Sequence, residues 1–171
     1  MKNNINNIIL MFPGQGSQHA GMGSEFLKKN IKYGKYFKIA SEISGTSLLD
    51  IIEGSKAKTG LLDRTEYSQI AIYTLSCVLN DYLFEKNGKL ASAAGFAVGH
   101  SLGDYSALYS SRAYSFEKGA EFVSFRGKIM SEAGGSKLTG KTKKMMMSAV
   151  IGLDIETISK VLESYRESVF I

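Results

Sequence analysis

Two short apolar runs, each stopped by glycine, most constrain the fold of this chain. Residues 7–12 read NIILMF and end at Pro13-Gly14, and residues 93–98 read AAGFAV and end at Gly99. Apolar runs that end in turn residues are typical of strands buried in a parallel sheet. Because stretches with helical spacing lie between and after them, the order of elements indicates an α/β fold, with a parallel sheet flanked by helices.

The rest of the first 133 residues predicts helices. We expect the long third helix to be mostly buried and to end at Gly88, because glycine is a frequent helix C-cap. Ser115 and Asp154 are suitable N-caps for two later helices. The expected helices are residues 23–44, 48–52 and 65–87, one that starts just after Ser101, one from Ser115 to about Ala133, and one that follows Asp154.

The last forty residues differ in character. Residues 131–144 are rich in Gly, Ser and Lys and predict a loop or hinge, residues 145–153 predict a strand, and residues 169–171 predict the start of another. A strand and one helix cannot bury both of their faces alone. The chain is therefore expected to stop inside a structural unit, as a truncated protein would.

Composition excludes several functional classes. Cys77 is the only cysteine, so an internal disulfide is impossible, and the only two histidines, His19 and His100, lie too far apart in sequence to favour a structural zinc site. No window approaches the roughly 20 apolar residues of a membrane span, which predicts a soluble, cytoplasmic protein with no membrane partner.

The net charge of +5 leaves a solvated basic surface and an acidic partner both open. The dense basic cluster lacks interleaved aromatic residues and any nucleic-acid motif, which argues against a nucleic-acid partner. Its members are Lys137, Lys141, Lys143 and Lys144.

The residues Gly99-His100-Ser101-Leu102-Gly103 fit the pattern G-x-S-x-G, directly after the second apolar run. In this pattern a strand enters a sharp turn, a serine is exposed at its tip, and a helix leaves. Ser101 is then a candidate nucleophile, and the backbone N–H of Leu102 a candidate oxyanion donor. The alternative is a tight strand–helix turn that merely requires small residues.

The first run is also followed by a glycine turn, PGQGSQ at residues 13–18. It has neither the Walker lysine nor a G-x-G-x-x-G, so a nucleotide loop is not expected. An oxyanion hole usually takes its second N–H from a separate loop, and the N–H of Gln15 is a candidate. The alternative is a turn whose glycines only supply backbone freedom.

Arg126 falls within the apolar arc of the helix from Ser115, between Phe122 and Met130. A cation that faces the interior is costly unless it is paired. Its partner could be an internal Asp or Glu, or the side chain could extend to the rim of the arc. The functional alternative is that it pairs with a carboxylate of the substrate.

Four segments together resemble the malonyl-CoA:acyl carrier protein transacylase family, in that family's order: FPGQGSQ (12–18), GHSLGDYSAL (99–108), FRGKIMSEA (125–133) and AVIGL (149–153). The resemblance covers nearly the whole chain but only the N-terminal half of a family member. It implies an α/β hydrolase-like domain with an inserted ferredoxin-like subdomain. Residues 1–136 would begin the acyltransferase domain, and residues 144–171 would be the incomplete start of the insertion.

The resemblance also implies roles for individual residues. Ser101 would carry the malonyl group, and Gln15 and Leu102 would supply the oxyanion N–H groups. Arg126 would pair with the malonate carboxylate, and Gln69 would line the pocket. His100 would lie beside the nucleophile, in the substrate site, without being its base. The family's base histidine belongs to the part that this chain does not match. We therefore predict negligible turnover by these 171 residues alone.

The resemblance implies malonyl-CoA as the substrate and an acyl carrier protein as the partner, in fatty acid biosynthesis, with no cofactor or metal. The basic surface would suit both partners.

Asp104 and Ile70 depart from the family pattern, which usually has Glu and Pro at these positions, and residues 138–144 are unusually rich in lysine. Two other functions remain open. One is a non-catalytic fragment, either a decayed or split gene product or a module that binds carrier protein. The other is a serine hydrolase or a transferase for another acyl group.

Overall fold

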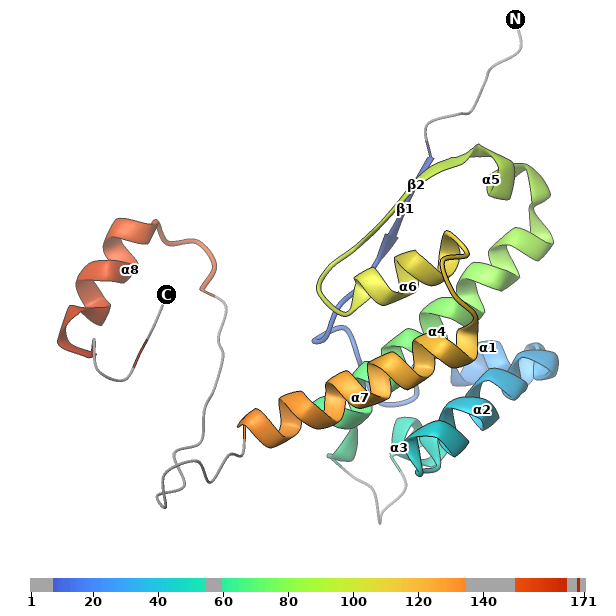
Figure 1. Ribbon diagram of the computed structural model, residues 1–171, viewed down its shortest axis with the longest axis horizontal. Helices are drawn as coiled ribbons and strands as arrows, with labels where there is room; N and C mark the ends of the chain where they lie inside the picture. The colour runs from blue at the N-terminus through green and yellow to red at the C-terminus, as the bar shows by residue number, and fades with distance from the viewer. Residues whose placement is uncertain (1–7, 55–59, 135–149, 166–168, 170–171) are drawn as a thin grey trace, which may run out of the picture.

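The structure is a computed structural model that describes residues 8–54, 60–134, 150–165 and 169 (Figure 1). Its strands are β1 (Ile8–Phe12) and β2 (Ala94–Gly99). Its helices are α1 (Ser24–Lys29), α2 (Gly34–Ser44), α3 (Leu48–Glu53), α4 (Thr65–Lys86), α5 (Gly88–Ala93), α6 (Gly103–Ser110), α7 (Phe116–Gly134) and α8 (Ile155–Leu162). Short 3-10 turns are η1 (Ile31–Tyr33), η3 (Leu61–Asp63) and η4 (Glu163–Tyr165).

The two predicted strands form a parallel pair, which confirms the α/β class. Ile9 pairs with Phe96 and Met11 with Val98 in the register of the sheet. The α6 helix packs against both strands. One face of the pair is covered by helices, as Figure 1 shows for α4 and α6.

The opposite face of the β1–β2 pair is apolar and open to solvent. Exposed fractions are 55% for Ile9, 81% for Met11, 69% for Phe96 and 45% for Val98. These four side chains alternate with Leu10 and Ala97, which are partly buried on the helix side. The sheet thus buries one of its faces within the described residues.

The α4 helix forms the centre of the core. Most of its residues from Ser68 to Asn80 are buried, and α7 is the helix it contacts most extensively. This close approach depends on small residues in α7: a side-chain carbon on Gly119 would lie 2.0 Å from the Tyr73 hydroxyl, and one on Gly127 would lie 3.0 Å from the Glu66 Cα. The sequence prediction of a long, mostly buried helix over 65–87 is confirmed.

A shared carboxylate ties three helices together beside this core. The Asp81 side chain of α4 accepts hydrogen bonds from the hydroxyls of Tyr36 in α2 and of Tyr109 in α6, the latter at 2.7 Å. Burial, together with the hydrogen bond to Asp81, raises the pKa of Tyr36 to about 12. Both phenols therefore remain neutral donors at physiological pH.

Two helix boundaries differ from the prediction. The stretch 23–44 is not continuous, because Asn30 leaves the helical region (φ −135°) and its side chain donates to the Phe26 carbonyl at 2.9 Å. Gly88 does not end the long helix. Asn87 does, and its side chain then accepts the Leu90 N–H at 3.2 Å, which caps the short helix α5. In both cases an asparagine side chain bonds to nearby backbone, a local competition that periodicity does not detect.

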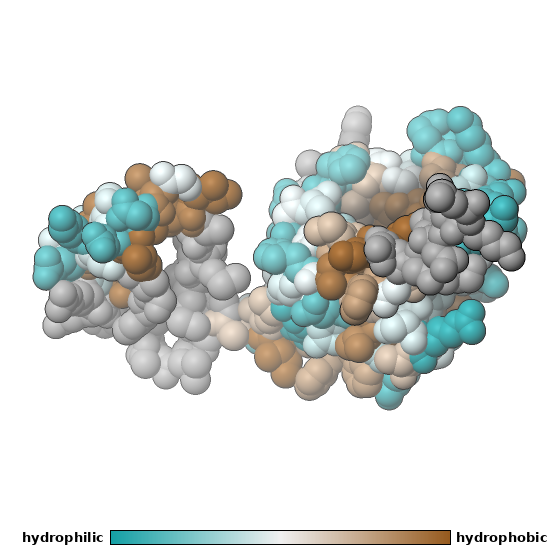
Figure 2. Space-filling view, turned by 90° about the horizontal axis from the view of Figure 1, so that it is seen from above, coloured by the Kyte–Doolittle hydropathy of each residue, from teal (hydrophilic) through white to brown (hydrophobic). Residues whose placement is uncertain are grey.

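The described part of the C-terminal segment contains an amphipathic helix, α8. The α8 helix begins as predicted at Asp154, whose carboxylate accepts the Thr157 N–H at 2.8 Å. Figure 2 shows its hydrophobic and hydrophilic residues on separate sides. Residues 150–153 form no strand, so that part of the predicted strand is wrong, and residues 145–149 and the lysine cluster at 137–144 lie outside the described residues. The domain boundaries proposed at 136 and 144 stay predictions.

Candidate functional site

Ser101 occupies the strained tip of a strand–helix turn. It follows β2, precedes α6, and has a positive φ of 54°, which non-glycine residues seldom adopt. The glycines of the pattern have no room for a side chain: a carbon on Gly103 would lie 2.2 Å from the Phe12 carbonyl oxygen, and one on Gly99 2.0 Å from the Gly103 carbonyl carbon. The turn therefore packs tightly on β1 and keeps Ser101 exposed, as the G-x-S-x-G pattern predicted.

Arg126 reaches this serine from α7. Its Nη2 donates to the Ser101 Oγ at 2.9 Å, and its Nη1 donates to the Gln69 carboxamide oxygen. Gln69 is fully buried in α4, and its own amide contacts the Met130 sulfur at 3.4 Å. The guanidinium carbon also lies 5.9 Å from the centre of the Tyr105 ring. The family resemblance implied one site for Ser101, Arg126 and Gln69, and the structure brings their side chains together.

The α7 helix divides its predicted apolar arc into two sides. Val123 and Gly127 are buried against the core, whereas Phe122 and Ile129 are exposed. Arg126 is only partly buried, at the border between these sides. Of the two structural alternatives, the one at the rim of the apolar arc is therefore confirmed, and an interior position is not. Arg126 borders a groove.

This groove has a volume of about 880 Å³. Ser101 and Arg126 belong to its wall, and apolar and aromatic side chains make up most of the rest. Its lining residues are Ser101, Asp104, Tyr105, Leu108, Tyr114, Phe122, Phe125, Arg126, Ile129 and Met130. A candidate nucleophile and a cation thus share one open, largely apolar hollow.

The glycine turn after β1 lies directly against the serine turn. A side-chain carbon on Gly14 would lie 2.4 Å from the His100 carbonyl oxygen, and the His100 N–H donates to the Phe12 carbonyl at 3.1 Å. The turn is braced internally, since the Ser17 hydroxyl donates to the Gly14 carbonyl at 2.9 Å. Gln15 directly follows Gly14, which contacts the serine turn. Leu102 directly follows Ser101, and its side chain is buried.

The charges around Arg126 are unbalanced. Among the residues the structure describes, no Asp or Glu forms an ion pair with it, and its hydrogen-bond partners Ser101 and Gln69 are neutral. The expected internal acidic partner is therefore not found there. A cation so placed favours the alkoxide form of Ser101 but cannot accept its proton.

Within the same described ranges, no histidine nitrogen hydrogen-bonds to the Ser101 hydroxyl. His100 precedes Ser101 in sequence, and its ring Nδ1 lies against Gly14 instead. Cys77 is no alternative nucleophile, because burial raises the pKa of its thiol well above the usual range. Among the described residues, the side chain that hydrogen-bonds to the candidate nucleophile is thus a cation and not a histidine.

Comparison with known proteins decides the family. The family model described as the acyl transferase domain matches residues 9–150. The chain belongs to this acyl transferase family. It is 36% identical over 163 residues to a malonyl CoA-acyl carrier protein transacylase of Buchnera aphidicola subsp. Schizaphis graminum (strain Sg), an alignment that covers 94% of this chain and 49% of that protein.

Solved structures agree with this assignment. A malonyl-CoA:acyl carrier protein transacylase from Helicobacter pylori matches with a TM-score of 0.72 and 32% identity, over 91% of this chain and 47% of that one. A type II PKS acyl-carrier protein in complex with its malonyl-transacylase contains a chain that matches with a TM-score of 0.72 and 28% identity, over 95% of this chain and 49% of that one. The chain spans about half the length of the relatives it matches.

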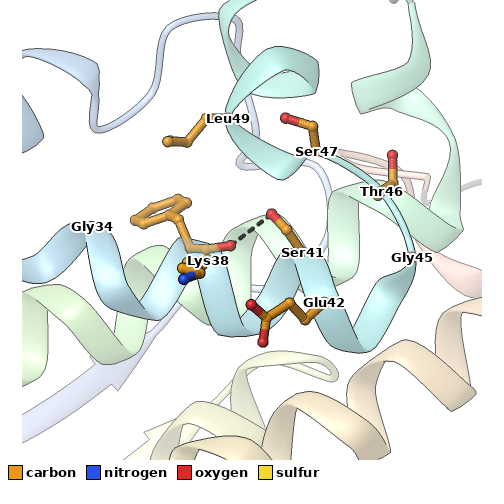
Figure 3. A pocket seen from close by; sticks show the side chains of 9 residues that line it. Gly34, Lys38, Ser41, Glu42, Gly45, Thr46, Ser47 and Leu49 are labelled. Atoms are coloured by element: carbon orange, nitrogen blue, oxygen red, sulfur yellow. Dashed lines mark hydrogen bonds between the residues drawn. The ribbon is translucent and has the colours of Figure 1, made fainter.

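A second hollow, of about 520 Å³, lies between α2 and α3 in this acyl transferase chain (Figure 3). The Ser41 hydroxyl in its wall is bonded to the protein itself, since it donates to the Phe37 carbonyl at 2.7 Å and accepts the Leu48 N–H at 3.0 Å. The described residues also contain no cluster of His, Cys, Asp and Glu that could hold a metal ion, and none of their helices is long and apolar enough to span a membrane. The groove at Ser101 is thus the better candidate site.

Sequence reasoning missed two residues at this site. Thr65, the first residue of α4, bonds to the Gln15 side chain, and Tyr105 lies beside the Arg126 guanidinium. Tyr105 could have been found, because it follows Ser101 by one helical turn. Thr65 gave no such signal, since its partner is fifty positions away in sequence.

Proposed function

We propose that these residues form the acyl-binding site of a malonyl-CoA:acyl carrier protein transacylase. The observation that carries the proposal is the Arg126 guanidinium, which touches the Ser101 oxygen and has only neutral partners among the described residues. A cation without a carboxylate, placed beside a nucleophile, suits an acyl group that brings its own carboxylate. The malonyl group is an acyl group of this kind.

The proposed reaction has two half-reactions. The Ser101 oxygen attacks the thioester carbonyl of malonyl-CoA, the C–S bond breaks, and coenzyme A leaves with the proton that the serine gave up. The thiol of the carrier protein then attacks the serine ester, the C–O bond breaks, and the proton returns to Ser101. Two displacements on one serine give ping-pong kinetics.

Each site residue has one role in this scheme. The backbone N–H groups of Gln15 and Leu102 bind the carbonyl oxygen as it becomes negative, Arg126 binds the free carboxylate, and Gln69 orients Arg126. His100 belongs to the substrate site without being the base. The proton acceptor is the histidine that the family resemblance implies, in the half of the relatives' length that this chain does not span.

The proposed partners follow from the same relatives. The solved complex pairs a related malonyl-transacylase with its acyl-carrier protein, which supports a carrier protein as the acceptor. We extend this to fatty acid biosynthesis in the cytoplasm, with coenzyme A entering only as part of the substrate and with no cofactor.

A test of the nucleophile uses imidazole as a substitute for the missing base. The purified chain is incubated with malonyl-CoA, and the serine ester is measured by intact mass. We expect acylation about 10⁶-fold slower than in a complete serine enzyme, a rate that rises with imidazole concentration, and no ester in Ser101→Ala. Turnover at ordinary enzymatic rates without imidazole would contradict the assignment of the base.

A test of selectivity compares malonyl-CoA with acetyl-CoA in the same assay. Arg126→Ala is expected to lower the malonyl-to-acetyl rate ratio about 10- to 100-fold, whereas Arg112→Ala, at an exposed arginine after α6, is the matched control. An unchanged ratio in Arg126→Ala would refute the malonyl assignment. Fast loss of the ester to water, rather than to a carrier thiol, would favour a hydrolase.

A further inference from the structure

The side chain of Gln15 is tethered to the start of α4. Its Nε2 donates to the Thr65 Oγ1 at 2.6 Å, and the same hydroxyl donates back to the Gln15 Oε1 at 2.8 Å. Thr65 is the first residue of the 22-residue helix at the centre of the core. An exposed residue in a glycine turn is thus joined to the most buried element of the molecule.

Among the described residues, no other side-chain hydrogen bond joins the turn at residues 13–18 to a helix. Gly16 has a φ of +103°, and its N–H donates to the Gln18 side chain at 2.8 Å, so these bonds hold the turn only to itself. Gly14 contacts the His100 backbone, one residue from Ser101. A displacement of Gln15 would therefore move backbone that lies directly against the nucleophile turn.

The first turn of α4, which begins at Thr65, also packs on α7, the helix that carries Arg126. The next residue, Glu66, packs on Gly127 of α7, and its carboxylate accepts a hydrogen bond from Ser131. Gly127 follows Arg126 directly in sequence. The first turn of α4 thus contacts the glycine turn on one side and the helix that carries the cation on the other.

We propose that Thr65 is a positioning residue, which fixes the Gln15 backbone N–H relative to Ser101 and Arg126. This inference rests on the proposed acyl transfer, in which that N–H binds the developing oxyanion. Loss of one oxyanion donor typically slows such reactions about 10²–10³-fold. A donor that is still present but less well held should account for part of this effect, about tenfold.

The test removes the hydroxyl while keeping the shape of the side chain. Thr65→Val deletes both hydrogen bonds, Thr65→Ser retains the hydroxyl, and Gln15→Met deletes the carboxamide while keeping the backbone N–H. Thr46→Val, in the α2–α3 connection, is the control for the substitution itself. Each variant is measured by hydrogen exchange of the peptide covering residues 13–18 and by the imidazole-assisted acylation of Ser101.

We expect Thr65→Val and Gln15→Met each to speed exchange in residues 13–18 and to lower the maximal acylation rate about tenfold, with the half-saturating malonyl-CoA concentration unchanged within about twofold. Thr65→Ser should restore both. The double variant should be no worse than either single one, because both remove the same interaction. A merely structural role would instead change the melting temperature without this rate effect.

Three results separate the hypotheses. Equal exchange in all variants would overturn the tether, and faster exchange with an unchanged acylation rate would overturn its positioning role. If the wild-type chain formed no serine ester with malonyl-CoA at all, the proposed function would fail, and the exchange data would still decide whether Thr65 holds the turn.

Discussion

Ser101 combines backbone strain with an exposed position beside Arg126. Its φ of 54° lies in the left-handed region, where a residue with a Cβ is destabilised by about 1 kcal/mol or more. Gly99 and Gly103 pack closely on neighbouring backbone and so restrict the conformation of the turn. Backbone strain of this kind persists where the surrounding packing fixes the conformation. Here that conformation places the serine oxygen next to Arg126.

This strain is measurable by comparing two variants that both lack the hydroxyl. We expect Ser101→Gly to be about 1 kcal/mol more stable than Ser101→Ala, because glycine adopts positive φ without a steric penalty. Urea denaturation of both variants gives the difference directly. Neither should be acylated.

A second position calibrates that measurement. Arg112 has a φ of 61° in the connection between α6 and α7 and lies away from the lining of the groove. The pair Arg112→Gly and Arg112→Ala should show a difference of the same sign. If glycine stabilised position 112 and not position 101, the Ser101 backbone would not be strained in solution.

At the scale of single residues, the sequence predicted which side chains belong to the candidate site better than it predicted how deeply each one is buried. Ser101 was found because its pattern follows an apolar run, and Arg126 because a cation stood among apolar residues. The helical wheel left open whether Arg126 lies inside or at the rim of the apolar arc, since it does not tell which apolar residues of α7 are buried. Exposed Phe122 and Ile129 show that part of that arc lines a groove instead.

At the scale of elements, the contact between α6 and β1 depends on one missing side chain. A Cβ on Gly103 would lie 2.2 Å from the Phe12 carbonyl oxygen, which is backbone and cannot rotate away. Helix α6 and strand β1 would have to separate to accept it. The position of Ser101, directly before α6, depends on that contact.

We therefore expect Gly103→Ala to destabilise the protein by about 3 kcal/mol. Gly34→Ala is the matched control, because Gly34 begins α2 and has nothing within 4 Å of the added carbon. Its stability should stay equal or rise by up to about 1 kcal/mol. Both are measured by urea unfolding, and similar stabilities in the two variants would contradict the close packing at Gly103.

The sequence predicted the helices and strands that have strong local patterns. It did not predict the helix boundaries at which a side chain takes a backbone hydrogen bond in place of the helix. Strands β1 and β2 and the long helix α4 follow from apolar runs and length. The break at Asn30 and the restart at Gly88 do not, because asparagine side chains there bond backbone groups that the pattern assigns to a helix. Pairing across the sheet also had to come from the structure.

At the scale of the whole molecule, we expect the open face of the β1–β2 pair to promote self-association in solution. Its four apolar residues, Ile9, Met11, Phe96 and Val98, are adjacent in the sheet and largely exposed. Adjacent exposed apolar side chains on strands promote self-association. The register of the sheet identifies these four residues as the ones that would cause such self-association.

Replacing two residues of this face should reduce association without loss of fold. We expect Met11→Thr with Phe96→Thr to lower binding of an apolar dye and to shift sedimentation toward monomer, because threonine keeps strand propensity while removing exposed apolar area. Ile31→Thr is the control, since Ile31 is 82% exposed in a 3-10 turn, outside this face. If Ile31→Thr reduced association equally, association would depend on exposed apolar area in general and not on this face of the sheet. A wild-type chain that is monodisperse and melts cooperatively would show that the open face is tolerated, and would make the chain a stable domain by itself.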